Sequence, residues 1–411
     1  MKFKDYSIHS SIKNQLDVLG FKKPTDIQFK AIKHILDGED VMAVAPTGTG
    51  KTAAFIIPML HRLITKKPKT KNGVRSLVLV PTRELAAQIT DAAKLLAAQT
   101  SLKIVGIYGG VEQDKQIADL KKVTDILIGT PGRIFDLQAQ GFIHLEDLEI
   151  LVLDEADLML DLGFNKDVKD LVKRIPKNRQ TLFFTATISK KIKSLAYDIV
   201  RDAIRIQISP KNPVSKNVTH AVMFCEMDDK RFFLENLIKE NEELKFIVFV
   251  RTKVRAERVV AAMQRVDVKS EALHGGKEQT DRFSILDRFR SGENKVLVTT
   301  DVACRGIDIP NMDFVVNYDL PDNPENYVHR CGRTGRGTNK GQALSFCAPD
   351  EEKLLDDIEE YTGEEVNRYE LTPSEYQQIL QDSDDNHFEN GDYNWKKLMK
   401  EFDNPDAWDD K

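Results

Sequence analysis

The stretch that decides the fold reads APTGTGKT and runs from Ala45 to Thr52. Its glycines allow a tight turn whose backbone N–H groups can bind phosphate oxygens. Lys51 can neutralise phosphate charge, and the Thr52 hydroxyl can ligate Mg²⁺. Because Ala45 stands where a strict P-loop has glycine, the stretch read alone is also typical of a flexible glycine-rich turn.

A second motif, Asp154-Glu155-Ala156-Asp157, directly follows the apolar run Ile150–Leu153. We therefore expect the Asp154 carboxylate at a strand tip, where it can hold the metal from the other side. Glu155 could orient or deprotonate the attacking water. Read alone, this motif is an acidic helix start. Together the two motifs predict an ATPase that binds ATP and Mg²⁺, with metal ligands Thr52 and Asp154 and with a phosphate loop of Thr47, Gly48, Thr49, Gly50, Lys51 and Thr52.

The composition indicates a soluble globular protein. The chain has 411 residues, a length sufficient for two domains and a tail. Of these residues 41% are hydrophobic and 30% are charged. No apolar run reaches the roughly 18 residues of a membrane span, and the N-terminus lacks the apolar core of a signal peptide. The four cysteines show no paired or metal-ligand spacing. We expect a reduced, cytoplasmic protein with no membrane contact.

The net charge of −5 conceals two regions of opposite sign. Residues 350–411 hold 21 acidic and 6 basic side chains, whereas the preceding residues hold 44 acidic and 54 basic ones. A basic body is compatible with a polyanionic partner, although a merely soluble surface has the same composition.

Two series of short apolar runs alternate with helical patterns, which indicates parallel sheets covered on both faces. The polar stretch 209–217 contains two prolines and is the expected linker between the two series. The first series comprises 41–45, 76–80, 103–108, 125–129, 149–153, 181–185 and 205–208. The second comprises 218–225, 245–250, 268–273, 295–299, 313–317 and 342–347.

The second series has no phosphate loop, but it carries the basic stretch His329–Arg336. Such a stretch is often only a solvated surface. Arg333 and Arg336 could instead supply the arginine finger that the first series lacks, a group worth about 10³–10⁵ in rate.

These motifs resemble those of one family, the DEAD-box RNA helicases of superfamily 2, over about residues 1–350. Gly20–Gln28 with the upstream Phe3 resembles the Q motif, and Ala45–Thr52 is similar to the family's motif I, which has alanine first. The remaining elements resemble motifs Ia, GG, Ib, II, IV, QxxR, V and VI in order, at 81–85, 109–110, 130–133, 154–157, 249–252, 279–282, 300–308 and 329–336.

The resemblance implies an α/β fold of two tandem RecA-like parallel-sheet domains with an acidic C-terminal tail. We expect the ATP-binding domain over 1–208, the linker over 209–217, the second domain over 218–360 and the tail over 361–411. It also implies that Phe21 stacks on adenine, that Gln28 bonds adenine in two places, that Asp308 reaches the ribose, and that Thr25 and Gly306 belong to the nucleotide site. For Phe21 a core position before a helix is equally open.

For catalysis the resemblance implies Lys51, Asp154, Glu155, His329, Arg333 and Arg336, while an exposed helix-capping role for His329 stays open. Thr185 and Thr187 are similar to the motif that couples hydrolysis to unwinding, with threonine in place of the family's first serine. It further implies contacts to the RNA backbone, which carry no sequence information. The residues concerned are Thr82, Arg83, Gly110, Thr130, Arg133, Thr252 and Thr300.

We therefore predict an ATP-dependent RNA helicase, a monomer that acts on single strands or short duplexes. Two alternatives stay open, an ATP-gated RNA clamp that never unwinds and a DNA helicase of the same superfamily. Cys331 replaces the family's isoleucine and suggests sensitivity to oxidants. The acidic tail is either a solubilising extension or a docking segment for the basic RNA face or a protein partner, and it carries Tyr393, Trp395, Phe402 and Trp408.

Overall fold

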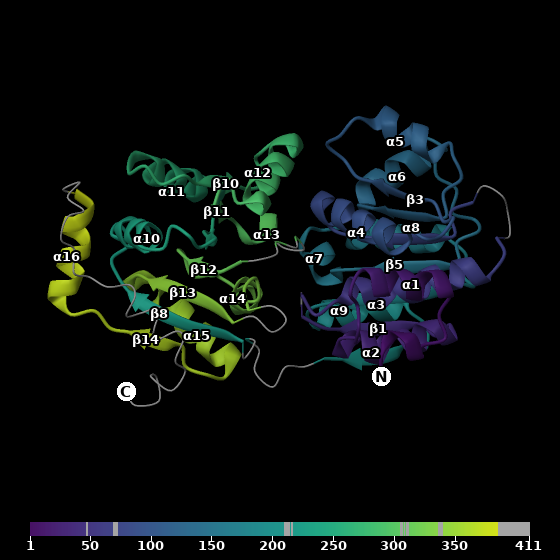
Figure 1. Ribbon diagram of the computed structural model, residues 1–411, viewed down its shortest axis with the longest axis horizontal. Coiled ribbons are helices and arrows are strands. Elements are labelled where there is room, and N and C mark those ends of the chain that lie inside the picture. Colours follow the sequence, from purple (N-terminus) through teal and green to yellow (C-terminus); the bar gives the residue numbers. More distant parts are fainter. Residues whose placement is uncertain are drawn as a thin grey trace. The chain divides into compact units, whose positions relative to one another are not determined.

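A computed structural model describes residues 1–46, 48–68, 73–208, 214, 217–304, 307, 309, 312–335 and 340–384. The chain divides into two compact units, with the boundary between Ser209 and Pro210. Each unit is a parallel sheet with helices on both faces (Figure 1). Of the predicted linker, only residues 214 and 217 lie within the described ranges.

The first sheet has seven strands among the described residues, in the order β3-β4-β2-β5-β6-β1-β7. Every pair is parallel, which requires a crossover between consecutive strands. The strands are β1 (Val41–Val44), β2 (Ser76–Leu79), β3 (Ile104–Ile107), β4 (Ile126–Gly129), β5 (Ile150–Leu153), β6 (Gln180–Thr185) and β7 (Ile204–Gln207).

Side chains alternate between two cores on either face of this sheet. Val41 and Ala43 pack with helices α1 to α4, whereas Met42 packs with α6 to α9. This double burial explains why the strands are apolar throughout. The helices are α1 (Ser10–Val18), α2 (Asp26–Asp37), α3 (Lys51–Thr65), α4 (Arg83–Leu96), α5 (Gln113–Leu120), α6 (Pro131–Ala139), α7 (Ala156–Asp161), α8 (Asn165–Arg174) and α9 (Lys190–Ile199).

The second sheet repeats this topology strand for strand, in the order β10-β11-β9-β12-β13-β8-β14. Each strand of the second sheet therefore occupies the position of a strand of the first in the same chain order, from β8 in the position of β1 to β14 in the position of β7. The strands are β8 (Val218–Phe224), β9 (Phe246–Phe249), β10 (Glu271–Leu273), β11 (Val296–Thr299), β12 (Phe314–Asn317), β13 (Gly341–Cys347) and β14 (Asn367–Tyr369). The helices are α10 (Lys230–Lys239), α11 (Lys253–Arg265), α12 (Gln279–Ser291), α13 (Asp301–Cys304), α14 (Pro324–Cys331), α15 (Glu352–Thr362) and α16 (Pro373–Asp384).

The second unit extends past residue 360, the limit that the sequence suggested. Tyr369 of β14 pairs with Met223 of β8, and Ile379 of α16 is buried in the core with α10 and α11. The boundary at 360 was therefore placed too early, because a three-residue strand beside acidic helices gives no periodic signal of its own. The α/β prediction with two tandem RecA-like sheets is confirmed.

No helix within the described ranges is long and apolar enough to cross a membrane.

Candidate functional site

The phosphate loop connects β1 to α3, and glycine is required at its end. Gly50 has a φ of +90°, and a Cβ there would lie 2.5 Å from Nε2 of Gln28. Gly48 is also left-handed, with φ +83°. Thr49 closes the turn by donating its hydroxyl to the carbonyl of Pro46 at 2.7 Å. The loop therefore delivers the chain into the N-terminus of a 15-residue helix, whose free N–H groups attract anions.

Lys51 and Glu155 form a buried ion pair that joins this loop to the acidic motif. Lys51 Nζ donates to Glu155 Oε1 at 2.9 Å, and their side chains are only 5% and 10% exposed. Burial lowers the pKa of Lys51, but the charges of Glu155, Asp154 and Asp157 outweigh it, and the net shift is upward. Glu155 itself sits in the left-handed region, with φ +50°, so its backbone is held in an unusual conformation.

Asp154 follows β5 directly and is 2% exposed. Burial raises its pKa to about 7, an effect that the charge of Lys51 opposes. A cation would relieve this cost, and Mg²⁺ typically takes only one or two carboxylates beside phosphate oxygens and waters. Among the described residues there is no group of three or more His, Cys, Asp or Glu that could hold a metal ion alone. Asp154 with the Thr52 hydroxyl at the start of α3 fits that sparse ligand set.

Asp157 connects the acidic motif to β6. Its Oδ2 accepts hydrogen bonds from the backbone N–H groups of Ala186 and Thr187, both at 3.1 Å. The Thr185 hydroxyl, at the end of β6, donates to the carbonyl of Thr187 at 3.0 Å. The predicted coupling residues are thus bonded to the acidic motif through the Asp157 carboxylate.

Gln28 links the predicted adenine-binding segment to the phosphate loop. Its Oε1 accepts from the Thr25 backbone N–H at 3.0 Å, and its Nε2 donates to the Gly50 carbonyl at 3.1 Å. One amide hydrogen and one acceptor position remain for a base. Phe21 is 36% exposed, and its ring meets the buried Phe3 ring edge-on at 6.1 Å.

Hydroxyl, amide and guanidinium groups follow β2, β3 and β4, which are neighbours in the sheet. The Thr82 hydroxyl caps α4 by accepting from the Leu85 N–H at 3.3 Å. Thr130 is the N-cap residue of α6, and Gly110 is left-handed, with φ +75°. Because the carboxyl ends of parallel strands meet at one edge, these residues share that edge with the phosphate loop.

Two arginines belong to this edge. The Arg83 guanidinium lies 3.4 Å from where a Cβ on Gly109 would be, so this group lies against the paired glycines. Arg133 lies in the first turn of α6, and no described residue accepts a hydrogen bond from its buried Nη1. That nitrogen is a donor for which a phosphate oxygen is a suitable acceptor.

The second unit repeats the hydroxyl pattern at equivalent strand ends. Thr252 follows β9 and caps α11 by accepting from the Arg255 N–H at 3.1 Å, as Thr82 does after β2. Thr300 follows β11 and precedes α13, in the place of Thr130 after β4.

One arginine of the basic stretch, Arg330, has a structural role that the sequence did not reveal. Arg330 is 1% exposed, and its guanidinium donates two hydrogen bonds to the Asp301 carboxylate, at 2.6 and 2.8 Å. The same guanidinium lies over the Phe249 ring. It therefore stabilises the core of this unit. Arg333 lies in the turn after α14, and His329 lies within that helix. Arg336, Gly306, Asp308 and Thr47 lie outside the described residues.

Cys331 does not have the environment of a redox-sensitive thiol. It is fully buried, and burial raises its pKa to about 12, so the reactive thiolate is suppressed. This environment argues against the oxidant sensitivity that the sequence suggests, because the thiol faces the interior.

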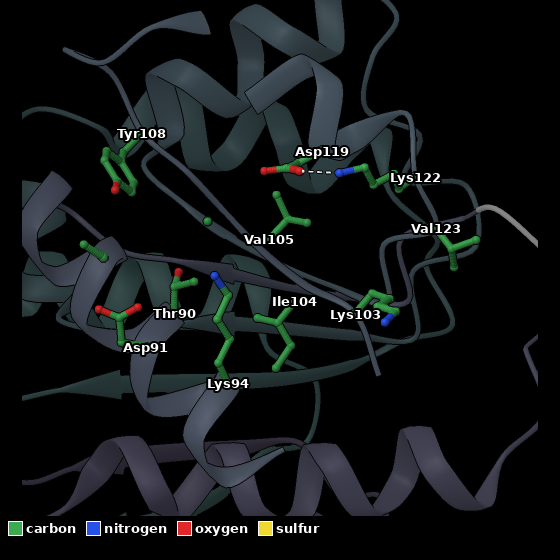
Figure 2. Close-up of a pocket in the computed structure, with 12 residues that line it drawn as sticks. Thr90, Asp91, Lys94, Lys103, Ile104, Val105, Tyr108, Asp119, Lys122 and Val123 are labelled. Carbon is green, nitrogen blue, oxygen red and sulfur yellow. Dashed lines mark hydrogen bonds and ion pairs between the residues drawn. The ribbon is translucent and has the colours of Figure 1, made fainter. Parts of the chain in front are cut away.

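A cavity of about 610 Å³ lies at the β3 edge of the first unit, apart from these groups (Figure 2). It is lined by Lys94 and Thr90 of α4, by Val105 of β3, and by the Asp119–Lys122 pair. None of the predicted nucleotide or RNA residues lines it. The cavity therefore does not mark the candidate site. We assign that site to the carboxyl edge of the sheet, from the chemistry of the residues that follow its strands.

Comparison with known proteins gives the same division of the chain. The family model "DEAD/DEAH box helicase" matches residues 25–195, and "Helicase conserved C-terminal domain" matches 229–338. The chain is 42% identical to the ATP-dependent RNA helicase RhlB of Shewanella frigidimarina (strain NCIMB 400), over 89% of this chain and 85% of that protein. It is 37% identical to the ATP-dependent RNA helicase DbpA of Bacillus subtilis (strain 168), over 91% and 77%.

Solved structures agree. S. cerevisiae Dbp5 bound to RNA and ADP BeF3 is 30% identical, with a TM-score of 0.82 over 92% of this chain and 98% of that one. Mss116p bound to ssRNA and AMP-PNP is 28% identical, with a TM-score of 0.82 over 93% and 82%.

Fold and loop together define a P-loop protein built from two RecA-like units. The relatives and both family models identify the family within this class: the chain belongs to the DEAD-box helicases.

Proposed function

We propose that this chain is an ATP-dependent RNA helicase that opens short RNA duplexes or remodels RNA–protein complexes, coupled to RNA-stimulated ATP hydrolysis. The observation that carries the proposal is the buried Lys51–Glu155 pair, which joins a phosphate loop to an acidic motif at one sheet edge. The same edge presents the hydroxyl and amide groups that suit an RNA backbone.

For nucleotide binding, the loop N–H groups and the N-terminus of α3 would hold the phosphates. Lys51 would neutralise them, and Thr52 and Asp154 would hold Mg²⁺. The metal, when bound, supplies charge that stabilises the phosphoryl oxygens in the transition state. The exposed Phe21 and the remaining hydrogen-bonding groups of Thr25 and Gln28 suit adenine.

Glu155 is the proposed water-orienting group. Its carboxylate is bonded to Lys51, the same ammonium that phosphate oxygens would attract. Phosphate binding would therefore weaken the ion pair and free one carboxylate oxygen to accept a proton from water. Asp157 would pass the change to Thr185 and Thr187 through its two backbone hydrogen bonds.

For RNA, the groups at the strand ends suit phosphate and 2′-hydroxyl oxygens and read no base. The first unit offers Thr82, Arg83, Gly110, Thr130 and Arg133, and the second offers Thr252 and Thr300. Because these groups are present in both units, we propose that one RNA strand contacts both.

The second unit would complete hydrolysis with Arg333 and Arg336 on the γ-phosphate, His329 near the acidic motif, and Gly306 and Asp308 on the ribose. In this scheme ATP and single-stranded RNA bring the units together, and phosphate release parts them. We also propose that the protein is a cytoplasmic monomer, since ATP and RNA are available there, and light scattering tests the monomer.

The test combines three measurements on the full chain. Strand displacement from a short RNA duplex should require ATP, and single-stranded RNA should stimulate the ATPase far more than DNA of the same sequence. Stimulation without any displacement, together with ATP-dependent RNA residence, would assign the chain to the clamp alternative. Equal stimulation by DNA would contradict an RNA-specific enzyme.

A further inference from the structure

The second unit contains an arginine-lined cavity apart from the proposed RNA and nucleotide residues. It has a volume of about 470 Å³ and lies between α10 and α11, two helices that Figure 1 labels on one side of this sheet. Four of its lining residues are arginines. They are Arg231 at the start of α10 and Arg255, Arg258 and Arg265 along α11.

The positive charge of this cavity is largely unbalanced. Arg255 is engaged, since its Nε lies 3.3 Å from Asp319 and its guanidinium lies 5.2 Å over the Tyr318 ring. By contrast, no carboxylate among the described residues forms an ion pair with Arg231, Arg258 or Arg265, whose side chains are exposed, although the Arg231 guanidinium lies 4.3 Å over the Phe232 ring. Among the lining residues, only Asp228 is acidic. Guanidinium groups placed in this way suit carboxylates, which they bind through two parallel hydrogen bonds.

The base of the cavity is apolar, which narrows the choice of ligand. Tyr318 and Val259 are both 4% exposed, and Met227 and Ala262 also line the cavity. A nucleic-acid backbone or a free phosphate would use the arginines and leave this base uncovered. A peptide with an aromatic side chain between carboxylates would cover both parts.

The chain itself contains a segment with that composition. Residues 401–411 read EFDNPDAWDDK, in which Phe402 and Trp408 are surrounded by five acidic residues and one lysine. This segment belongs to 385–411, which lies outside the described residues.

The segment follows a helix that packs on α10, one of the two helices that border the cavity. Helix α16 ends at Asp384 and packs on α10, the helix that carries Arg231. Tyr376 donates to Asp229 at 2.7 Å, Asn236 donates to the Ile379 carbonyl at 3.3 Å, and Ser383 bonds Glu235. The residues after Asp384 can span roughly 3.3 Å each when extended, so chain length does not prevent them from reaching the cavity.

We propose that the cavity between α10 and α11 binds the acidic aromatic segment 401–411 of the same chain. Its carboxylates pair with Arg231, Arg258 and Arg265, and one of its aromatic rings covers Tyr318 and Val259. A consequence for RNA rests on the proposed function. Because α11 begins beside Thr252, docked carboxylates would repel RNA phosphates and weaken RNA binding at low salt.

Tryptophan emission of the full chain tests docking without any assumption about function. The chain has two tryptophans, Trp395 and Trp408, and both lie after Asp384. Docking predicts a blue-shifted emission that acrylamide quenches poorly. The double variant R258E/R265E would remove two of the proposed ion pairs between the cavity and the segment. It should weaken docking roughly tenfold, giving red-shifted emission with stronger quenching. High salt should act in the same direction.

The matched control is K269E/K353E, which makes the same charge change on exposed lysines of the same unit outside the cavity and should leave emission unchanged. Charge exchange, with D409K/D410K added to R258E/R265E, should restore the protected emission. Circular dichroism checks that each variant folds.

Emission typical of exposed tryptophan in the wild type, unaltered by R258E/R265E, would overturn the proposal. Protection that rises with protein concentration would assign the cavity to the segment of a second copy. Unchanged emission with lower RNA crosslinking in R258E/R265E would assign it to RNA. Either result overturns docking within one chain. If the emission responds as expected but RNA affinity does not, docking stands and the proposed RNA path at Thr252 fails.

Discussion

The two units share one topology but use equivalent positions differently, and Lys51 and Lys230 show this most clearly. Each is the first residue of the helix after an equivalent strand, α3 after β1 and α10 after β8, and each is buried. Lys51 follows a glycine-rich loop and pairs with Glu155, whose side chain is 10% exposed. Lys230 follows a loop without glycine, pairs with the fully buried Glu351 and donates to the Tyr318 carbonyl at 2.8 Å.

The lysine of the second unit is therefore committed to its own core, whereas the lysine of the first can exchange its partner for phosphate. The hydroxyl-capped helices, by contrast, are present in both units, at Thr82 and Thr252. We infer that the phosphate loop and the metal ligands belong to the first unit alone, that the second unit contributes arginines to hydrolysis, and that backbone recognition is shared by both.

The largest expected effect tests whether the second unit takes part in hydrolysis at all. Arg333→Lys keeps the charge but loses the planar fork, and the RNA-stimulated ATPase should fall by about 10³–10⁵. Arg290→Lys, at the end of α12 in the same unit and outside the motif, serves as the control. A rate within threefold of wild type for Arg333→Lys would mean that the first unit hydrolyses ATP alone.

Glu155→Gln tests the assignment of the catalytic carboxylate. Turnover should fall by about 10²–10⁴, because the amide cannot accept the proton of the attacking water. Binding of a fluorescent ATP analogue should be retained or tightened, since Lys51 loses a competing partner. Phosphate release and nucleotide titration measure the two effects, and an ordinary turnover rate would refute the role.

The comparison of Lys51 with Lys230 can be tested directly by replacing each lysine with methionine, which removes the charge. Lys230→Met removes the buried partner of Glu351, which keeps an ion pair with the partly exposed Arg251 at 3.0 Å. It should lower the free energy of unfolding by about 3 kcal/mol, with Lys353→Met as the exposed control. Lys51→Met should cost less stability, because Glu155 can reach water, but should abolish ATP binding. Thermal unfolding and nucleotide titration separate the two variants. Equal stability losses would remove the distinction between a committed and an exchangeable lysine.

A smaller effect concerns acid stability. Burial lowers the pKa of His220, on β8, to about 4 from its ordinary value of 6.5. Between these values the unfolded chain binds a proton that the folded chain does not, so stability is full above pH 6.5 and falls as the pH drops. At pH 5 the loss should be about 1–2 kcal/mol. Hydrogen exchange at pH 5 and 7 should show it in β8 more than in β1, and His220→Gln should abolish the difference.

The sequence predicted the parts of this molecule that local pattern encodes. The apolar runs marked β1 to β13 because buried parallel strands are continuous apolar segments, and the glycine-rich loop marked the nucleotide edge. Interactions between distant residues were not predictable. The Lys230–Glu351 pair spans 121 residues, and the hydrogen bond from Gln28 to the Gly50 carbonyl gives that glutamine a structural task besides base recognition.

Arg330 illustrates the same limit within one motif. Spacing shows three arginines in the basic stretch but not that one of them turns inward to Asp301. β14 was missed because its three residues become a strand only by pairing with β8.

A crystal structure with a non-hydrolysable ATP analogue and an oligoribonucleotide would show whether both units contact the nucleotide and the RNA. We expect the γ-phosphate to contact Lys51 and the Arg333 guanidinium, and one RNA strand to lie against both Thr82 and Thr252. A γ-phosphate contacted by the first unit alone, or RNA bound to only one unit, would contradict this expectation.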